Sequence, residues 1–243
     1  MDKVLLITGA SSDIGMQLLQ DIYIDYSKIY LQYRTMSDSL AMLIRSLDSK
    51  VEIVPLQVDL ADDVSLANMI TAIKQTQVLP NHIIHLPAPK AYNKQFHKDS
   101  WNNYESGWEI SVHSIVEILQ AFIPQMVKNR YGRIVFMLTS YTHNIPPKFQ
   151  AGYVTVKYAL LGLMKALAVE YADKGITVNG VSPDMMETKF LSEVPQLIID
   201  KNKENSPLGR NIFVEEIIPI IQYMLSDAGA ALVGQNIVVS GGS

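Results

Sequence analysis

Tyr153 and Lys157 have the clearest potential for acid–base chemistry in this sequence. They stand four positions apart at the start of a helical pattern that continues through Ala172, so both side chains lie on one helix face. A phenol has an ordinary pKa of about 10, which makes it a poor proton donor or acceptor at neutral pH. A neighbouring ammonium group favours the phenolate and lowers the phenol pKa toward the working range. The pair therefore predicts a proton-transferring Tyr153 that is tuned by Lys157.

A loop of small residues near the N-terminus could hold a phosphate group. The segment TGASSDIG, residues 8–15, directly follows an apolar run and precedes apolar residues at helical spacing. Glycines permit a tight turn and the close approach of a diphosphate, whose charge is favoured by the free N–H groups and the positive end of the helix. A strand before the loop and a helix after it are the context that a dinucleotide-binding site requires.

The elements that must position these residues alternate along the chain. Seven short apolar runs are predicted strands: 4–8, 29–33, 51–58, 83–86, 133–138, 176–181 and 237–239. Between them, apolar residues recur at helical spacing, as at Leu66, Met69, Ile70 and Ile73. This alternation predicts a parallel sheet with helices on both faces, in which ligands bind beyond the carboxyl ends of the strands.

Together these features resemble the short-chain dehydrogenase/reductase family, and 3-oxoacyl-acyl-carrier-protein reductases in particular. TGASSDIG is similar to the family's TGxxxGxG loop, and YxxxK follows a strand that ends in Thr139-Ser140, with VNGVSP and GQNIVVSGG downstream in the family's order. The resemblance implies one doubly wound α/β Rossmann domain over 1–243, with a seven-stranded parallel sheet in the order 3-2-1-4-5-6-7. It also implies hydride transfer between a nicotinamide cofactor and a carbonyl or secondary alcohol, with 187–208 as a lid over the substrate.

The resemblance assigns roles to individual residues. Tyr153 is the acid/base, Lys157 tunes it and holds the nicotinamide ribose, and Ser111 takes the place of an asparagine that orders a proton-relay water. A hydroxyl that binds the substrate oxygen is either Ser140, 13 positions before Tyr153, or Thr139, which matches the count from Gly132; we predict Ser140. The implied cofactor contacts are Gly9, Ser11, Ser12, Asp13, Ile14, Gly15, Arg34, Asp59, Leu60, Pro87, Ala88, Tyr153, Lys157, Pro183 and Thr188.

Three departures from the family pattern affect this site. Asp13 replaces a glycine, and its carboxylate would repel a diphosphate unless the side chain turns outward or caps the helix. The NNAG segment reads LPAP at 86–89, which loses side-chain amides and, at the prolines, backbone donors. Asp184 replaces the usual glycine after Pro183. Asp13, the LPAP segment and Ser111 keep open an alternative function as a non-catalytic dinucleotide-binding or assembly protein.

The end of the second predicted strand bears on cofactor choice. Tyr33 and Arg34 stand there, close to the position at which NAD enzymes carry an acid that reads the ribose 2′-hydroxyl. A guanidinium can stack on adenine and pair with a 2′-phosphate. We therefore predict NADP(H) in preference to NAD.

Other constellations favour no different chemistry. His82 and His85 should point to opposite faces of a strand, which excludes a metal pair and indicates structural roles. No GxSxG nucleophile motif is present. Tyr141 and Lys148 have the Tyr-x6-Lys spacing of enoyl reductases, but Pro146 and Pro147 prevent the helix which that spacing needs.

Composition limits the class of protein and its partners. The chain has 243 residues, a net charge of −4 and no cysteine, which excludes a disulfide scaffold, a thiol nucleophile and a cysteine zinc site. There is no basic footprint for nucleic acid, no signal-peptide pattern, and the longest apolar runs, broken by Lys165, fall short of a membrane span. We predict a cytoplasmic enzyme that binds a small molecule and neither nucleic acid nor membrane.

Two further expectations concern partners. Lys128, Arg130 and Arg133 fall where 3-oxoacyl-acyl-carrier-protein reductases meet their acidic carrier. A carrier-bound acyl group is therefore one candidate substrate. Family members commonly pair through their long helices, so a homodimer or homotetramer is expected. The helices expected to pair span roughly 106–128 and 153–173, and Ile115, Ile118, Leu119 and Phe122 make the first of them apolar over more surface than a single seam requires, which predicts that they reach the interface.

Overall fold

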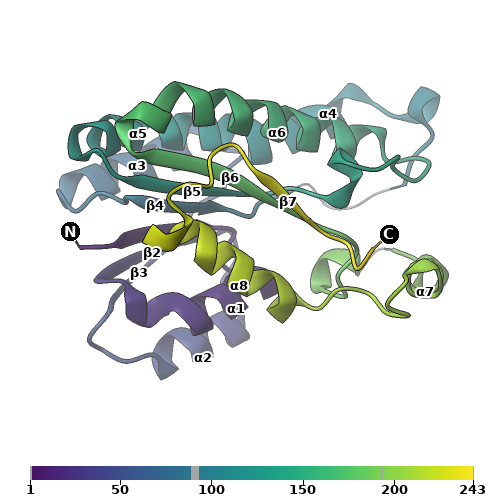
Figure 1. Ribbon diagram of the computed structural model, residues 1–243, viewed down its shortest axis with the longest axis horizontal. Coiled ribbons are helices and arrows are strands. Elements are labelled where there is room, and N and C mark those ends of the chain that lie inside the picture. Colours follow the sequence, from purple (N-terminus) through teal and green to yellow (C-terminus); the bar gives the residue numbers. More distant parts are fainter. Residues whose placement is uncertain (1, 89–92, 193, 243) are drawn as a thin grey trace.

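A seven-stranded parallel sheet organises the chain. The computed structural model describes residues 2–88, 93–192 and 194–242, and its strands lie in the order β3-β2-β1-β4-β5-β6-β7 (Figure 1). This confirms the predicted fold class and strand order, with each predicted strand boundary within two residues of the observed one. The strands are β1 (Val4–Thr8), β2 (Lys28–Tyr33), β3 (Glu52–Gln57), β4 (His82–His85), β5 (Gly132–Met137), β6 (Ile176–Pro183) and β7 (Asn236–Val239).

Helices cover both faces of this sheet (Figure 1). One face packs against α1 (Asp13–Ile22), α2 (Asp38–Ser46) and α8 (Val214–Leu225). The opposite layer contains α3 (Asp63–Gln75), α4 (Trp101–Trp108), α5 (Ser114–Asn129) and α6 (Ala151–Tyr171). The inner strands are buried on both faces, which is why they read as nearly continuous apolar runs. The short helix α7 (Gln196–Asn205) lies at the carboxyl end of the sheet (Figure 1).

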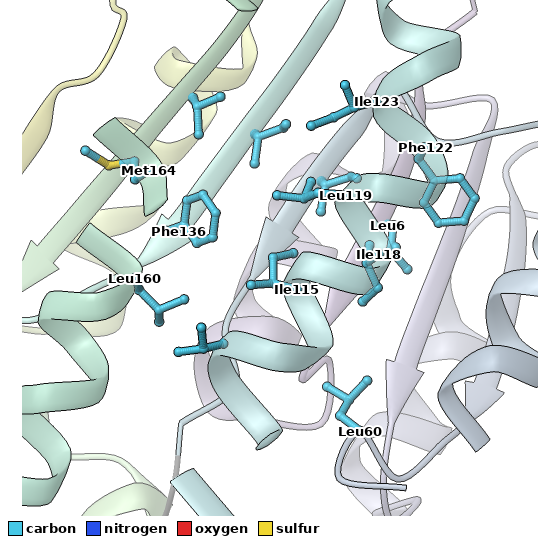
Figure 2. Packing of buried hydrophobic residues seen from close by; sticks show 14 of the residues in the cluster. Leu6, Leu60, Ile115, Ile118, Leu119, Phe122, Ile123, Phe136, Leu160 and Met164 are labelled. Carbon is cyan, nitrogen blue, oxygen red and sulfur yellow. The ribbon is translucent and has the colours of Figure 1, made fainter. Parts of the chain in front are cut away.

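The apolar face of α5 belongs to the core of the chain itself. Ile115, Ile118, Leu119 and Phe122 are each at most 2% exposed and belong to one buried cluster with Leu6 of β1 and Phe136 of β5 (Figure 2). The prediction that these four residues form an interface between copies is therefore wrong. The sequence pattern identified a buried helix face correctly, but the sheet covers that face and no partner is needed for it.

Two helical stretches of the described chain are long and strongly apolar. Trp101–Asn129 and Ala151–Lys174 are long and apolar enough to cross a membrane by length and composition alone. Their apolar character has an explanation in the fold, because the side chains that face the sheet fill its core. Leu160 and Met164 of α6, for example, are fully buried close to Phe136 (Figure 2).

Candidate active site

A pocket of about 580 Å³ opens at the carboxyl ends of the central strands. A second cavity of about 460 Å³ adjoins it and shares Gly9, Ser11, Pro87 and Ala88. Between them, the two cavities are lined by every predicted cofactor residue except Gly15. Of the predicted catalytic residues, Tyr153 and Lys157 line the larger pocket, whereas Ser140 and Ser111 are buried behind its wall.

The loop after β1 has a shape that only its glycines allow. Gly9 has a φ of +75°, in the left-handed region that side chains disfavour. A Cβ at Gly15 would lie 2.7 Å from the Ala10 carbonyl oxygen, so glycine lets α1 approach the loop closely. The Ser12 hydroxyl caps α1 by accepting from the Gly15 N–H at 3.1 Å. Gly15 therefore shapes the loop, and the N-terminus of α1 faces the pocket as a diphosphate would require.

Asp13 turns away from α1 and reaches the segment that follows β6. Its Oδ2 accepts a hydrogen bond from the Lys189 backbone N–H at 2.7 Å, and Oδ1 lies 4.0 Å from the Lys189 Nζ. Ser12, not Asp13, is the N-cap of α1. The carboxylate thus bonds to the chain after β6 although Asp13 lines the pocket, and it ties the glycine loop to residues 187–208.

The second cavity lies beside the carboxyl ends of β2 and β3. Arg34, Thr35, Asp59 and Leu60 line it, whereas the Tyr33 side chain is only 7% exposed. Asp59 also accepts the Ala61 backbone N–H at 3.0 Å, which fixes its carboxylate. The position that carries an acid in NAD enzymes is therefore filled by a buried phenol, and the neighbouring guanidinium lines the cavity.

Tyr153 and Lys157 occupy the first turns of α6 and face the larger pocket together. The Lys157 Nζ donates to the Met137 carbonyl oxygen at 2.7 Å and lies 5.8 Å from the centroid of the Tyr153 ring. The Lys157 residue is only 1% exposed. The end of β5 thus holds the lysine in place beneath the phenol.

Burial dominates the protonation of both groups. It lowers the pKa of Lys157 to about 7 and raises the pKa of Tyr153 above its ordinary value. A hydrogen bond with the Thr139 side chain partly opposes the rise at Tyr153, and the nearby Tyr141 adds to it. The predicted lowering of the phenol pKa by Lys157 is not seen here, because the apolar surroundings disfavour the charged form of each partner.

Thr139, and not the predicted Ser140, has its hydroxyl next to Tyr153. Thr139 hydrogen-bonds Tyr153 and lines the pocket, whereas the Ser140 Oγ donates to the Asp184 Oδ1 at 3.1 Å. Strand pairing fixes positions counted from Gly132, the first residue of β5, whereas the loop before α6 can vary in length. The count from Gly132 was therefore the better guide, and the geometry favours Thr139 over Ser140.

Ser111 lies in a π-helical turn, Glu109–His113, between α4 and α5. Its Oγ is 3.4 Å from the Pro87 carbonyl oxygen, and its own carbonyl oxygen is 2.8 Å from the His85 Nε2. Single π-helical turns are rare and frequently occur at functional sites. The LPAP segment contributes Leu86, Pro87 and Ala88 to the pocket wall, while Pro89 lies outside the described residues.

Residues after β6 cover part of the pocket. The Phe190 ring lies 6.1 Å from that of Tyr153, and Leu191, Val194 and Ile198 also line the pocket. Not every apolar residue of the expected lid, 187–208, lines the pocket. Leu197 is 79% exposed, and Ile199 is buried outside the pocket lining. Pro183 and Thr188, which the resemblance assigns to the cofactor, also line the pocket.

Tyr141 and Asp184 are two of the pocket residues that were not predicted as part of the site. Tyr141, in the short helix Ser140–Thr142, lies edge-on to Tyr153 with ring centroids 6.5 Å apart, and burial together with Asp184 raises its pKa to about 12. Asp184 accepts the Ser140 hydroxyl and, at 3.3 Å, the Asn202 amide of α7. The Tyr-x6-Lys spacing placed Tyr141 under consideration, and Lys148 also lines the pocket, although the two do not share a helix. The one sequence signal for Asp184 was that it replaces the glycine that usually follows Pro183 in the family.

His82 and His85 point to opposite faces of β4, as predicted. His82 hydrogen-bonds Tyr26 and Tyr131, whereas His85 faces Thr8 and Ser111. Elsewhere among the described residues, a cluster of Asp63, Glu109 and His113 brings possible ligand atoms within 4.8 Å, and ion pairs account for this arrangement.

Comparison with protein families places this geometry among known oxidoreductases. A family model described as Enoyl-(Acyl carrier protein) reductase matches residues 9–243. The chain is 26% identical to the 3-oxoacyl-[acyl-carrier-protein] reductase FabG of Staphylococcus epidermidis, over 100% of this chain and 99% of the relative. It is also 26% identical to the oxidoreductase UcpA of Salmonella typhimurium, over 99% of this chain and 94% of the relative.

Solved structures share the fold at lower identity. Levodione reductase matches with a TM-score of 0.89 and 19% identity, covering 100% of this chain and 97% of that one. A 3-oxoacyl (acyl-carrier-protein) reductase from Agrobacterium tumefaciens with NADP bound matches with a TM-score of 0.86 and 19% identity, over 99% and 94% of the two chains. NAD+-bound xylitol dehydrogenase matches with a TM-score of 0.88 and 22% identity, over 99% and 98%. Neighbours that bind either nicotinamide dinucleotide therefore have this fold.

Proposed function

The chain belongs to the short-chain dehydrogenase/reductase family of NAD(P)-dependent oxidoreductases, and on that basis we propose that it reduces a carbonyl group with Tyr153 as the proton donor. The observation that carries the proposal is the position of Tyr153. Its phenol forms a hydrogen bond with the Thr139 side chain, and its ring centroid lies 5.8 Å from the Nζ of the buried Lys157. All three residues line the pocket that the glycine loop and the segment 187–208 also line.

The residues around the pocket fit a nicotinamide dinucleotide. The turn at Gly9 and the N-terminus of α1 suit a diphosphate, Arg34 and Asp59 suit the adenosine end, and Lys157 suits the nicotinamide ribose. The nicotinamide supplies the hydride to the carbonyl carbon in reduction, or takes it in oxidation.

The side chains then have distinct tasks at the substrate oxygen. The Thr139 hydroxyl hydrogen-bonds that oxygen and orients it, while Tyr153, which burial keeps protonated, gives it a proton as negative charge develops. Because burial brings the pKa of Lys157 to about 7, this lysine can return a proton to the phenolate near neutral pH. The hydroxyl of Ser111 would hold a water behind Lys157.

Turnover assays test this proposal against its rival, a protein that binds a dinucleotide without catalysis. NADPH oxidation should be measured with a panel of ketones, 3-oxoacyl thioesters and 2-enoyl thioesters, alongside calorimetric binding of NADPH. Turnover of a ketone or 3-oxoacyl thioester supports the proposal, and tight NADPH binding without turnover of any compound supports the rival. Reduction of enoyl thioesters alone would move the acid role toward Tyr141.

We predict that Arg34 gives the protein a preference for NADPH. Arg34→Ala should weaken NADPH binding by about 10- to 100-fold and leave NADH binding nearly unchanged, since an arginine–phosphate contact is worth about 1.5 to 3 kcal/mol. Titration calorimetry of both cofactors on both proteins measures this difference. Arg45→Ala, an exposed arginine on α2 that lines neither cavity, is the matched control. Equal dissociation constants of the unmutated protein for the two cofactors would contradict the prediction.

A carrier-bound acyl group remains a proposed substrate class, without support from the basic cluster. Arg133 is 4% exposed and pairs with Asp227, and Arg130 donates to the Asp173 carbonyl oxygen. Both residues lie at the start of β5, whereas the pocket opens at its end. The apolar lining from the segment 187–208 and the named activity of the FabG relatives support an acyl substrate instead.

A cytoplasmic location likewise stays a prediction.

We also propose a homodimer or homotetramer, with an interface different from the one that the sequence suggested. Large apolar side chains are exposed on α4 and α6, among them Trp101 at 71% and Val169 at 83%. Light scattering at micromolar concentration should give at least twice the mass of the chain, and Val169→Glu should lower it. Met42→Glu, an exposed apolar position on the opposite face of the sheet, is the control that should leave the mass unchanged. A monomeric unmutated protein would overturn the assembly proposal.

A further inference from the structure

His85 joins three parts of the site that are far apart in the sequence. It is the last residue of β4 and is 1% exposed. Its Nε2 lies 2.8 Å from the carbonyl oxygen of Ser111, and its Nδ1 lies 2.8 Å from the Oγ1 of Thr8, the residue before the glycine loop. A carbonyl oxygen can only accept, so Nε2 carries the proton and Nδ1 accepts from the Thr8 hydroxyl. The imidazole is therefore held in one tautomer by two partners.

The π-helical turn explains why a side-chain donor is needed at this place. The Ser114 N–H bonds to the Glu109 carbonyl, one residue beyond its α-helical partner, and the Ser114 hydroxyl bonds instead to the carbonyl of Ile110 at 2.6 Å. The next carbonyl, that of Ser111, accepts from His85. The Ser114 N–H is thus displaced from the Ile110 carbonyl, and the side chains of Ser114 and His85 bond to two successive carbonyl groups of the turn.

His85 also lies beside the proposed catalytic lysine. Burial lowers its pKa to about 3, the hydrogen bond to the Ser111 carbonyl opposes this shift, and the charge of Lys157 adds to it. The imidazole is accordingly neutral at physiological pH. It donates to the π-helical turn without placing a second positive charge near Lys157.

We propose that His85 is a positioning residue for the proposed reductase reaction: it holds the Ser111 turn against the ends of β1 and β4. The proposal rests on the function argued above. Pro87 has no N–H, so the segment after β4 lacks a backbone donor at this position. The imidazole of His85, two residues earlier at the end of β4, provides a side-chain donor. Ser111 then stays in place with its hydroxyl within reach of the Pro87 carbonyl oxygen.

Two conservative variants separate the two hydrogen bonds. His85→Gln places an amide N–H at the reach of the imidazole Nε2 and preserves the bond to Ser111, whereas His85→Asn reaches only as far as Nδ1 and preserves the contact with Thr8. His85→Asn should lower kcat by about 10- to 100-fold, which is the scale of a small misplacement in an active site, and should change the KM for NADPH little. His85→Gln should keep most of the kcat of the unmutated protein. His85→Asn should also increase the solvent deuterium isotope effect on kcat, because proton delivery becomes slower.

His82 is the matched control on the same strand. It is fully buried and bonded to two phenols on the opposite face of the sheet, so His82→Gln should lower the melting temperature and leave kcat unchanged. Amide exchange of residues 109–114 provides a readout that needs no substrate. It should accelerate in His85→Asn and not in His85→Gln or His82→Gln.

The outcomes distinguish this inference from the proposed function. Equal kcat and equal exchange in the Asn and Gln variants would overturn the role of His85. An unmutated protein that binds NADPH but turns over no substrate would overturn the proposed function and, with it, a role in catalysis. The exchange measurement would then still decide whether His85 holds the turn.

Discussion

Tyr153→Phe should lower turnover by about 10²- to 10⁴-fold and leave NADPH binding nearly unchanged. The substitution removes the transferable proton, but the ring keeps its packing against Tyr141 and Phe190, whose centroids lie 6.5 and 6.1 Å away. Steady-state kinetics with a substrate of the unmutated protein, together with calorimetric binding of NADPH, measure the two quantities separately.

Two other tyrosines provide the controls for this experiment. Tyr158→Phe alters a phenol on the same helix that is 47% exposed, and it should leave turnover unchanged. Tyr141→Phe alters the second phenol in the pocket and should have a smaller effect than Tyr153→Phe. Near-normal turnover in Tyr153→Phe, or a larger loss in Tyr141→Phe, would show that the acid role is assigned to the wrong residue.

Lys157→Met should lower turnover and should also remove a rise in stability with pH that the unmutated protein shows. Turnover should fall on the order of 10²- to 10⁴-fold, and NADPH should bind more weakly, because the variant loses both the proton source and the proposed ribose contact. In the unmutated protein, burial lowers the Lys157 pKa from 10.5 to about 7. Below the lower value, folding must bury a charged lysine, and this penalty disappears as the pH rises toward 10.5.

Between these two pKa values the unfolded chain binds more protons than the folded chain, so the free energy of unfolding rises with pH. The unmutated protein should therefore gain stability relative to Lys157→Met between about pH 7 and about pH 10. Urea unfolding of both proteins across this range measures the difference. Lys165→Met, at an exposed position of the same helix, should show no such trend. Parallel stability curves for Lys157→Met and the unmutated protein would contradict the burial of a titrating lysine.

Features that depend on strand pairing could be predicted well from the sequence. The bounds of β1 agree with the prediction, because a strand buried on both faces reads as an uninterrupted apolar run that ends at the first polar or glycine residue. The roles of Gly9 and Gly15 follow from the same strand-to-helix turn. Tyr153 and Lys157 face one pocket, as their spacing on a helix requires.

Features that depend on loops and on long-range contacts could not be predicted in this way. The choice between Ser140 and Thr139 could not be made from spacing alone, because the hydroxyl that lies next to Tyr153 depends on how the chain turns after β5. The contact between Asp184 and Asn202 joins residues 18 positions apart through the packing of α7, which no local pattern encodes. The apolar stripe of α5 predicted burial correctly but could not indicate whether the sheet or another copy provides it.

The contact of Asp13 with the Lys189 backbone has a kinetic consequence. It makes the turn that would cradle a diphosphate and the chain that covers the substrate into one hydrogen-bonded unit. Any outward movement of residues 187–192 has to break this bond, so we expect opening of the pocket and departure of the spent cofactor to occur as a single event. Closing segments of this kind sequester a reaction from water, and in this chain the same bond would couple that closure to the turn at Gly9.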